Sequence, residues 1–473
     1  MTEKNTNFAE IEDITEMKKL LFLSIPAILS LCVISCEKIP PGHPIEDPGE
    51  PVVEVNSITL DETSIHLFSS DRQLTATVDP ADVPVKWSSS DETIATVEQD
   101  GWVHILSAGT VTITARAGDK SAECTIYVNF CLSREGTSNC YIIPKSGLYY
   151  FKAAKGTGTL GISGISKVEV LWESTGTPTA PAKGSVIPGA VFYESEPDNC
   201  IGILTPTPLK DGNAVIAAKD ASGNILWSWH IWVCKDYDPS ATAQEYKNYN
   251  GTITGTMMDR NLGALSATPG DVGALGLLYQ WGRKDPFPGA CEIAQNKFSR
   301  ATGTWPAPME ANSSTGTINF VTKNPTTYLS HSDDWYYTGS TLIDNTRWQS
   351  TKTVYDPCPP GWRVPTGGDD GIWIKTTGKR FFDHSWDSTN KGMDLSDSFH
   401  CTGSDWYPAA GNLGASSGDI FNVGIRGLYW TCTPVGSSSI VYCLNINSSY
   451  EIVTLNGESS SRACGYSVRC CKE

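Results

Sequence analysis

The sequence predicts a mostly β protein built from several domains, on three observations. Its 473 residues are enough for about three domains of ordinary size. The chain has 43 glycines and 28 prolines, only 18% of its residues are charged, and its apolar residues occur in short runs between turn-forming residues. Long amphipathic helices are missing from the pattern. We therefore expect short strands and loops to dominate.

The charge balance excludes nucleic acid as a partner. The formal net charge is -17, and no run of lysine or arginine is longer than two residues. Proteins that bind nucleic acid need basic patches to neutralise phosphates, and this chain has none. The acidic surface is expected mainly to keep the protein soluble.

The first 36 residues have the pattern of an export signal, with translation expected to start at Met17. Residues 1–16 are polar and acidic, whereas 18–19 are both lysine and 20–31 form an apolar core. The apolar core is too short to span a bilayer, which needs about 20 residues. A small residue directly precedes Cys36. The segment is similar to the lipobox of bacterial lipoproteins, although an ordinary secretory signal with a coincidental cysteine would look alike.

The lipobox resemblance implies that Cys36 becomes the acylated mature N-terminus and holds the protein at a membrane. Residues 37–54 follow, rich in proline, glycine and acidic residues and without hydrophobic periodicity. Such a segment is typical of an extended tether. The sequence does not distinguish a periplasmic from a surface-facing anchor.

Residues 55–130 are predicted to form an immunoglobulin-like sandwich, because short alternating segments recur between turns. The stretches 85–91, 94–97 and 108–114 resemble the bacterial Ig-like group 2 family. That resemblance implies a stalk module rather than a ligand site. Cys124 has no second cysteine in this segment and is interpreted as a buried, inert thiol.

Residues 131–236 are predicted to be a second β-rich domain of unknown role. Trp227, Trp229 and Trp232 cannot all lie on one face of a strand, so at least one should pack outside the main core or into the next domain. His230, between them, is interpreted as a hydrogen-bonded structural histidine.

Residues 237–473 resemble the Fibrobacter succinogenes major paralogous domain, which is common in surface lipoproteins of Bacteroidota. The motifs that carry the resemblance are Gly276–Gly282, the proline-rich corner Tyr355–Thr366, Tyr429–Thr431 and Gly465–Cys470. It implies a C-type lectin-like α+β fold, in which the first and last strands pair and long loops cover one side. It also implies a disulfide between Cys358 and Cys470, and a lipid-anchored location at the cell outer membrane, facing outward.

Candidate ligand-binding residues are aromatic clusters that follow acidic residues in the loops of this domain. Aromatic rings beside carboxylates suit sugars, because the apolar face of a sugar stacks while its hydroxyls bond to acids. The alternative is that these rings fill the core. The candidates are Asp333, Asp334, Trp335, Tyr336, Tyr337, Asp405, Trp406 and Tyr407. Calcium-dependent sugar binding is not expected, because the Glu-Pro-Asn, Gln-Pro-Asp and Trp-Asn-Asp triplets are absent, and we predict no metal or other cofactor.

The fifteen cysteines leave an odd number, thirteen, after the signal and the lipidation site are removed. Cys432 and Cys443 flank a predicted hairpin and could pair across it. Cys131 and Cys234 lie near the two ends of the second β-rich domain and could clamp it.

Signatures of catalysis are not convincing, and the chain is not expected to be an enzyme. Residues 414–418 fit the Gly-x-Ser-x-Gly pattern but lie in a Gly/Ser loop without a flanking strand and helix. The sequence thus predicts a lipid-anchored envelope binding protein or adhesin that presents a lectin-like domain to a glycan or protein; the oligomeric state stays open. A structural or fimbrial assembly component is one alternative. An envelope enzyme related to formylglycine-generating enzymes, using cysteines such as Cys401 and Cys464, is another.

Overall fold

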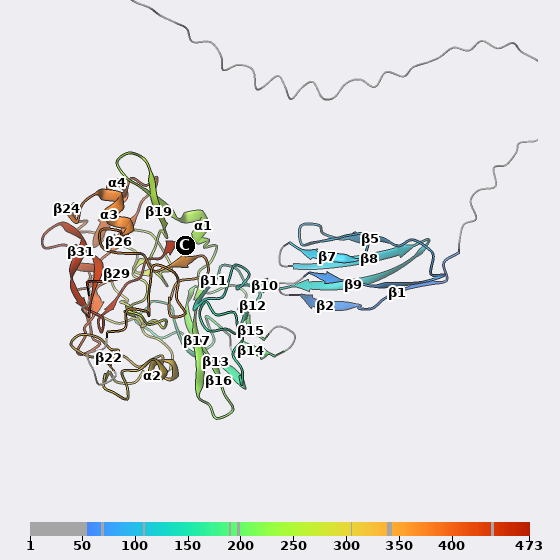
Figure 1. The fold of residues 1–473 in the computed structure, drawn as a ribbon, viewed down its shortest axis with the longest axis horizontal. Helices are drawn as coiled ribbons and strands as arrows, with labels where there is room; N and C mark the ends of the chain where they lie inside the picture. Colours follow the sequence, from blue (N-terminus) through green and yellow to red (C-terminus); the bar gives the residue numbers. More distant parts are fainter. Residues whose placement is uncertain are drawn as a thin grey trace, which may run out of the picture. The chain divides into compact units, whose positions relative to one another are not determined.

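The structure, a computed structural model, describes residues 54–473 apart from 68–70, 107–108, 189–190, 196–198, 304, 338–342 and 437–438. For 456–460 it describes the backbone alone. Residues Val55–Glu473 form one compact unit (Figure 1). The expected signal, Cys36 and nearly all of the tether lie outside the described residues. No helix in the described part is long and apolar enough to cross a membrane. The chain is mostly β, as predicted.

The first part of the compact unit is an Ig-like sandwich. Its main sheet has the strand order β2-β9-β8-β5, and a three-stranded sheet has the order β3-β7-β6. Along β8, Val111, Ile113 and Ala115 are buried while the residues between them are half-buried, which is the alternation expected of a strand with one face on a core. The strands are β1(Ser57–Leu60), β2(Ser64–Leu67), β3(Arg72–Gln73), β4(Ala76–Asp79), β5(Lys86–Ser89), β6(Ala95–Val97), β7(Trp102–Ile105), β8(Gly109–Ala117) and β9(Lys120–Val128).

Cys124 lies in the core of this sandwich, as the sequence predicts. Its side chain is fully buried and its thiol is free. Burial raises the pKa of the thiol to about 11, so it stays protonated and unreactive at neutral pH.

The second part is a sandwich of two four-stranded sheets. One has the order β10-β12-β15-β14 and the other β11-β17-β16-β13. An apolar core that includes Phe151, Ile201 and Ile216 lies between them. The strands are β10(Phe130–Cys131), β11(Cys140–Ile143), β12(Leu148–Lys152), β13(Lys167–Ser174), β14(Val191–Glu194), β15(Cys200–Leu204), β16(Gly212–Lys219) and β17(Ile225–Val233).

The tryptophans of β17 divide between its two faces, which confirms the sequence argument. Trp227 and Trp229 belong to the core of the second sandwich. Trp232 faces the other way and packs with Tyr237 and Leu262 of the terminal region. Its indole N–H donates to the backbone oxygen of Ala264 at 3.1 Å.

The terminal region, from residue 237 onward, is built from short strands, short helices and long connections. Helices begin and end at recognisable caps: the Thr317 hydroxyl accepts from the third residue of α2, and α3 ends at Gly378 with φ +67°. The elements are α1(Pro239–Thr242), β18(Gln244–Lys247), β19(Ile253–Met257), η1(Val272–Ala274), β20(Tyr279–Gln280), β21(Met309–Glu310), α2(Ile318–Lys323), β22(Leu329–Ser330), β23(Trp362–Arg363), α3(Ile372–Thr377), β24(Phe381–Asp383), β25(Gly392–Asp394), α4(Ser396–Phe399), β26(Trp406–Pro408), β27(Asn412–Leu413), β28(Ile420–Phe421), β29(Arg426–Pro434), β30(Ile440–Asn447), β31(Ile452–Ser461), β32(Gly465–Tyr466) and β33(Cys471–Lys472).

The two ends of the terminal region meet in one sheet, with the order β18-β19-β33-β23. Met257 of β19 opposes Cys471 of β33, and Arg363 of β23 opposes the same residue from the other side. This is the pairing of first and last strands that the lectin-like resemblance implies. The lectin-like family itself stays a prediction.

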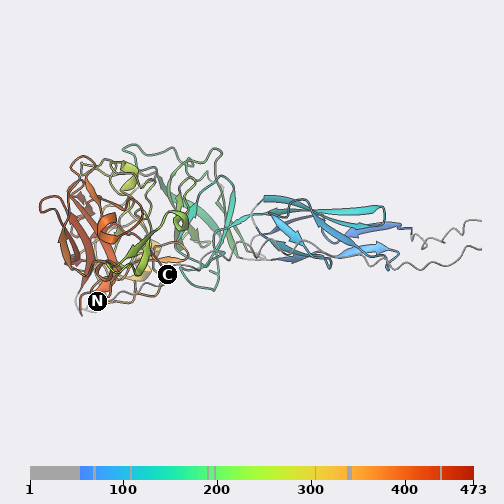
Figure 2. The same ribbon diagram turned by 90° about the horizontal axis from the view of Figure 1, so that it is seen from above.

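The second sandwich and the terminal region share one apolar core. The cluster joins Trp172 and Val215 of the sandwich to Trp281, Trp348 and Trp430 of the terminal region. Both ribbon views show the sheets of the sandwich against the terminal region (Figures 1 and 2). Residues on the two sides of this contact can therefore form a site with fixed geometry.

Candidate functional site

A cleft of about 810 Å³ opens where the second sandwich meets the terminal region. We call it the Pro–Trp cleft. Its lining combines aromatic rings and prolines with charged groups at the rim. The lining residues are Cys131, Leu132, Arg134, Glu135, Tyr141, Ile142, Pro144, Lys145, Asp236, Tyr237, Asp238, Pro239, Ser240, Pro359, Pro360 and Trp362.

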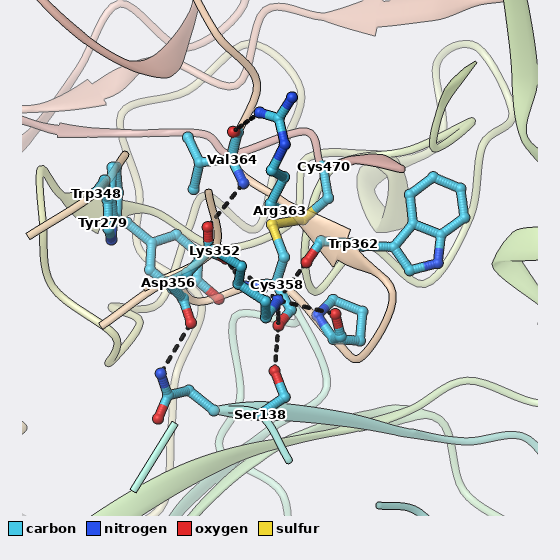
Figure 3. Close-up of a disulfide and its surroundings, with 12 residues drawn as sticks. Ser138, Tyr279, Trp348, Lys352, Asp356, Cys358, Trp362, Arg363, Val364 and Cys470 are labelled. Carbon is cyan, nitrogen blue, oxygen red and sulfur yellow. Dashed lines mark hydrogen bonds and ion pairs between the residues drawn. A yellow bond between two sulfur atoms is a disulfide. The ribbon is translucent and has the colours of Figure 1, made fainter. Parts of the chain in front are cut away.

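One wall of the cleft is the proline-rich corner that the sequence singled out. Gly361 turns the chain there with φ +74°, a conformation that residues with a Cβ resist. The disulfide between Cys358 and Cys470 ties the corner to the last strand, with 6.0 Å between the two Cα atoms (Figure 3). This is the bridge that the family resemblance implies. Trp362 then enters β23, so the wall is fixed at both ends.

A buried lysine and a buried aspartate hold the same corner from inside. The Lys352 ammonium donates to the backbone oxygens of Cys358 at 2.8 Å and Pro359 at 3.0 Å, and also to that of Trp362 (Figure 3). The Asp356 carboxylate accepts from the backbone N–H of Cys358 at 2.9 Å and lies 3.5 Å from the ammonium of Lys352. Three prolines remove backbone donors here, and the lysine satisfies carbonyls that would otherwise be buried without partners.

Two polar residues of the second sandwich, just before β11, form hydrogen bonds to the proline-rich corner and the residues before it. The Ser138 hydroxyl donates to the Cys358 oxygen at 2.5 Å. The Asn139 amide donates to the backbone oxygens of Val354 and Asp356, both at 2.8 Å. Two of these bonds are buried and the one to Val354 is partly buried. They join the second sandwich to the terminal region, so the contact beside the cleft is held by hydrogen bonds as well as by packing.

The base of the cleft contains a tyrosine held by an ion pair. The Arg260 guanidinium lies 3.9 Å from the centroid of the Tyr237 ring, and the Tyr237 hydroxyl donates to Asp259 at 3.2 Å. Burial raises the pKa of Tyr237 well above its usual value. The ring is 4% exposed and neutral, so it is a fixed part of the framework under the cleft rather than an acid or a nucleophile.

The rim carries exposed groups of both signs: Arg134, Glu135, Lys145, Asp236 and Asp238. Asp238 is occupied as the N-cap of α1, where it accepts from the Ser240 N–H at 2.8 Å. Arg134 is also occupied, because its guanidinium donates to the backbone oxygen of Ile105 at 3.2 Å. Glu135, Lys145 and Asp236 are exposed and can bond with polar groups of a ligand. An apolar lining with a polar rim is the composition of a binding site.

Two of the five residues in the first predicted aromatic cluster, Asp334 and Trp335, are buried, which matches the alternative that the ring fills the core. Trp335 is fully buried, and its indole N–H donates to the Trp281 oxygen at 2.8 Å. Asp334 is buried too, paired with the guanidinium of Arg347 and, at 3.5 Å, with that of Arg462. The carboxylate next to the tryptophan thus neutralises buried arginines.

Three members of that cluster remain reachable from solvent. Asp333 is exposed, while Tyr336 and Tyr337 are half-buried. The Tyr337 ring stacks on His331 with 5.2 Å between centroids.

The second predicted cluster is buried throughout, which matches the alternative that its rings fill the core rather than the prediction of a ligand site. Asp405, Trp406 and Tyr407 are 0%, 3% and 0% exposed. Asp405 pairs with Arg469 at 3.0 Å and accepts from the Tyr246 hydroxyl at 2.5 Å. Burial raises the pKa of Asp405 to about 6, although Arg469 favours its charged form. The cluster is a polar centre of the core.

Two other expected cysteine pairs are not formed. Cys131, Cys234 and Cys432 all have free thiols. Cys443 lies opposite Trp430 in the β29–β30 ladder, with a register shift beyond, so it does not face Cys432. Sequence distance from the hairpin turn could not reveal that shift.

The cysteines of the enzyme alternative are not activated. Burial raises the pKa of Cys401 to about 12 and raises that of Cys464 as well. Neither lines the Pro–Trp cleft. In the described part of the chain, no group of three or more His, Cys, Asp or Glu side chains could hold a metal ion.

The rim and base of the cleft were not identified from the sequence. The proline-rich corner was recognised only as architecture, and Tyr237 and Lys145 belong to motif-poor stretches. The sequence did contain one indication of a site here. The corner lies in the stretch that carries the family resemblance, and it places an aromatic residue beside three prolines.

Comparison with known proteins supports the family expected for the Ig-like sandwich. No curated protein matches the chain significantly. Among solved structures, domains 5–6 of the S-layer protein SbsC are 15% identical, cover 42% of this chain and 81% of that one, with a TM-score of 0.15. The Bacteroides ovatus mixed-linkage glucan utilisation protein SGBP-B, in complex with a heptasaccharide, is 18% identical over 41% of this chain and 45% of that one, with a TM-score of 0.12.

Human protocadherin-24 EC1-2 is 15% identical over 38% of this chain and 97% of that one, with a TM-score of 0.14. With scores this low, we infer neither fold nor function from these three structures. Residues 53–126 match the family model of the bacterial Ig-like domain (group 2), which confirms the family expected for this segment.

Proposed function

We propose that this chain is a cell-surface binding protein that takes a glycan or protein ligand in the Pro–Trp cleft. In this proposal Cys36 carries the lipid anchor at the outer membrane, residues 37–54 form the tether, and the Ig-like module acts as a spacer. The terminal region and the second sandwich then present the cleft. The role is binding rather than catalysis.

The observation that carries the proposal is a cleft of ligand-binding size with a rigid wall. Its volume of about 810 Å³ lies within the roughly 300–1,000 Å³ usual for ligand sites. The wall is fixed by a disulfide, by Lys352 and by Ser138. A wall that is already ordered loses little conformational entropy when a ligand binds, so more of the contact energy appears as affinity.

The lining favours a glycan over a protein. Half-buried prolines of the lining give apolar surface, while the ammonium of Lys145 and the carboxylate of Glu135 at the rim can donate to and accept from hydroxyl groups. Protein interfaces are instead extended patches of about 800 Å² per partner with a dry centre. A protein ligand is the alternative outcome of the test.

The test is a glycan array screen of the compact unit Val55–Glu473, with rim variants beside it. Lys145→Ala and Glu135→Ala leave the buried framework untouched, because both side chains are exposed. We expect saturable binding to a glycan class, weakened about ten-fold or more in at least one rim variant. Tyr337→Ala tests the half-buried first cluster in the same screen and is expected to bind normally.

Circular dichroism should show that every variant is folded. A folded protein that binds no glycan would reject the glycan proposal and shift the search to a protein ligand. Binding that both rim variants retain, but Tyr337→Ala loses, would move the site to the first aromatic cluster.

A further inference from the structure

A second pocket, of about 500 Å³, lies between the other end of the second sandwich and helix α2. We call it the lysine pocket, defined by Lys155, Lys323, Trp227 and Tyr355. It shares no lining residue with the Pro–Trp cleft. It therefore offers a site that is independent of the proposed function.

The pocket has a firm apolar side. The rings of Trp227 and Tyr355 lie 6.1 Å apart between centroids, tilted by 34°. The indole N–H of Trp227 donates to the side chain of Asn139 at 3.0 Å, which fixes that ring. Tyr355 is half-buried, so part of its face is open to the pocket.

The pocket also has an excess of positive charge. The Lys155 ammonium lies 5.6 Å from the centroid of Trp227, and the Lys284 ammonium lies 4.5 Å from the same centroid. Lys284 is buried and paired with Asp285 at 2.7 Å. Lys155 and Lys323 are exposed, and neither has a carboxylate within 4 Å among the residues that the structure describes.

The charges interact with one another. Burial lowers the pKa of Lys284, Asp285 opposes that effect, and the positive charge of Lys155 lowers the pKa further. Lys155 and Lys323 are exposed cations beside the Lys284–Asp285 pair, in a protein whose net charge is -17. A further carboxylate, that of Asp344, acts on the lining, because burial first and the Asp344 charge second raise the pKa of Tyr355. An anionic group from outside would be attracted to the two exposed lysines.

We propose that the lysine pocket binds an acidic saccharide, with the carboxylate of a hexuronic acid bonded to Lys155 and Lys323. The apolar face of the sugar ring packs on Tyr355. Asn319 is exposed and Thr322 half-buried in the same lining, so an amide and a hydroxyl are available to the sugar hydroxyls. A simple phosphate would use the lysines alone and leave the aromatic side without a function.

The experiment compares trigalacturonic acid with its methyl ester, which has the same rings without the charges. Binding to Val55–Glu473 is measured by isothermal titration calorimetry at about 50 mM salt. We expect the acid to bind at least ten-fold more tightly than the ester, and binding to weaken as salt is raised because opposite charges are screened. Lys323→Ala and Lys155→Ala should each weaken binding by about ten-fold, the scale of one charge-assisted hydrogen bond.

Two control variants separate charge from folding and from the other cleft. Lys323→Arg keeps the charge and should retain most of the affinity. Lys145→Ala, at the rim of the Pro–Trp cleft, should leave the affinity for trigalacturonic acid unchanged. Three results would each overturn the proposal, whatever the outcome at the Pro–Trp cleft. They are equal affinity for the acid and the ester, an affinity that neither Lys155→Ala nor Lys323→Ala changes, and no binding by the folded protein.

Discussion

His230 should make the body of this protein sensitive to mild acid. It lies on β17 inside the shared core and is 1% exposed. One ring nitrogen lies 2.9 Å from the side-chain oxygen of Asn213, and the other lies 3.4 Å from the Tyr279 hydroxyl. This arrangement suits the neutral imidazole, which donates to Asn213 and accepts from Tyr279. Burial lowers the pKa of His230 from 6.5 to about 3.

The direction in which pH changes the stability follows from proton linkage. Below pH 6.5 the unfolded chain takes up a proton at His230, whereas the folded chain does not until about pH 3. The unfolded state therefore binds more protons in this window, and stability falls as pH falls. With about 1.36 kcal/mol per unit of pKa difference, this one residue removes about 2 kcal/mol of unfolding free energy between pH 7 and pH 5.

The assay is urea unfolding of Val55–Glu473 at pH 7 and pH 5, followed by tryptophan fluorescence. Other groups also titrate in this range, so the same pair of measurements is made on His230→Gln, which cannot take up the proton. Wild type should lose about 2 kcal/mol more than the variant between the two pH values. Equal losses in both proteins, or an imidazole that titrates near pH 6.5 in the folded protein by NMR, would refute the reasoning.

Three further predictions follow from other contacts. Replacing both Cys358 and Cys470 by alanine opens a bridge across a sequence separation of 112 residues; the chain-entropy model predicts a loss of about 4.8 kcal/mol, measured by chemical denaturation. Asp334→Ala leaves two buried guanidinium groups without their carboxylate and should cost about 3–5 kcal/mol in the same assay, whereas a loss below about 1 kcal/mol would contradict the pairing. The pKa of His104 is raised by hydrogen bonds to Asp71 first and then to a second carboxylate. NMR titration should place the pKa of His104 above 6.5. The stability that His104 adds should be lost as pH rises through its folded-state pKa, and a pKa at or below 6.5 would contradict the contact.

Features that depend on neighbouring residues could be predicted from the sequence. Alternation along β17 indicated that at least one of its three tryptophans would leave the core of its own sandwich, and the structure places Trp232 in the shared core. His230 was expected to be hydrogen-bonded, and it is. Strand periodicity and turn residues identified the Ig-like module. Each inference needed only the period of a strand or a short motif.

The burial of Asp334 and of the second aromatic cluster involves partners that are distant in the sequence. Asp334 and Trp335 look like a loop motif, but Arg462, which pairs with that aspartate, is 128 residues further along the chain. Asp405 is separated from Arg469 by 64 residues. A single sequence does not show such pairings. The same acidic and aromatic residues would serve a sugar site or a buried ion pair equally well.

The buried ion pairs also have a consequence for ligand binding, because they order long loops of the terminal region. The connections between residues 283 and 354 have few strands to order them, and Arg347 lies 4.7 Å from the ring of Trp335 and pairs with Asp334. Such pairs contribute little net stability because both charges lose their hydration, but breaking one is costly, so they select a single arrangement of the chain. A binding protein gains affinity from loops that are ordered before the ligand arrives. Trp335 lines a small cavity together with Tyr355 and Thr322, which also line the lysine pocket, so this ion pair orders the chain beside that pocket.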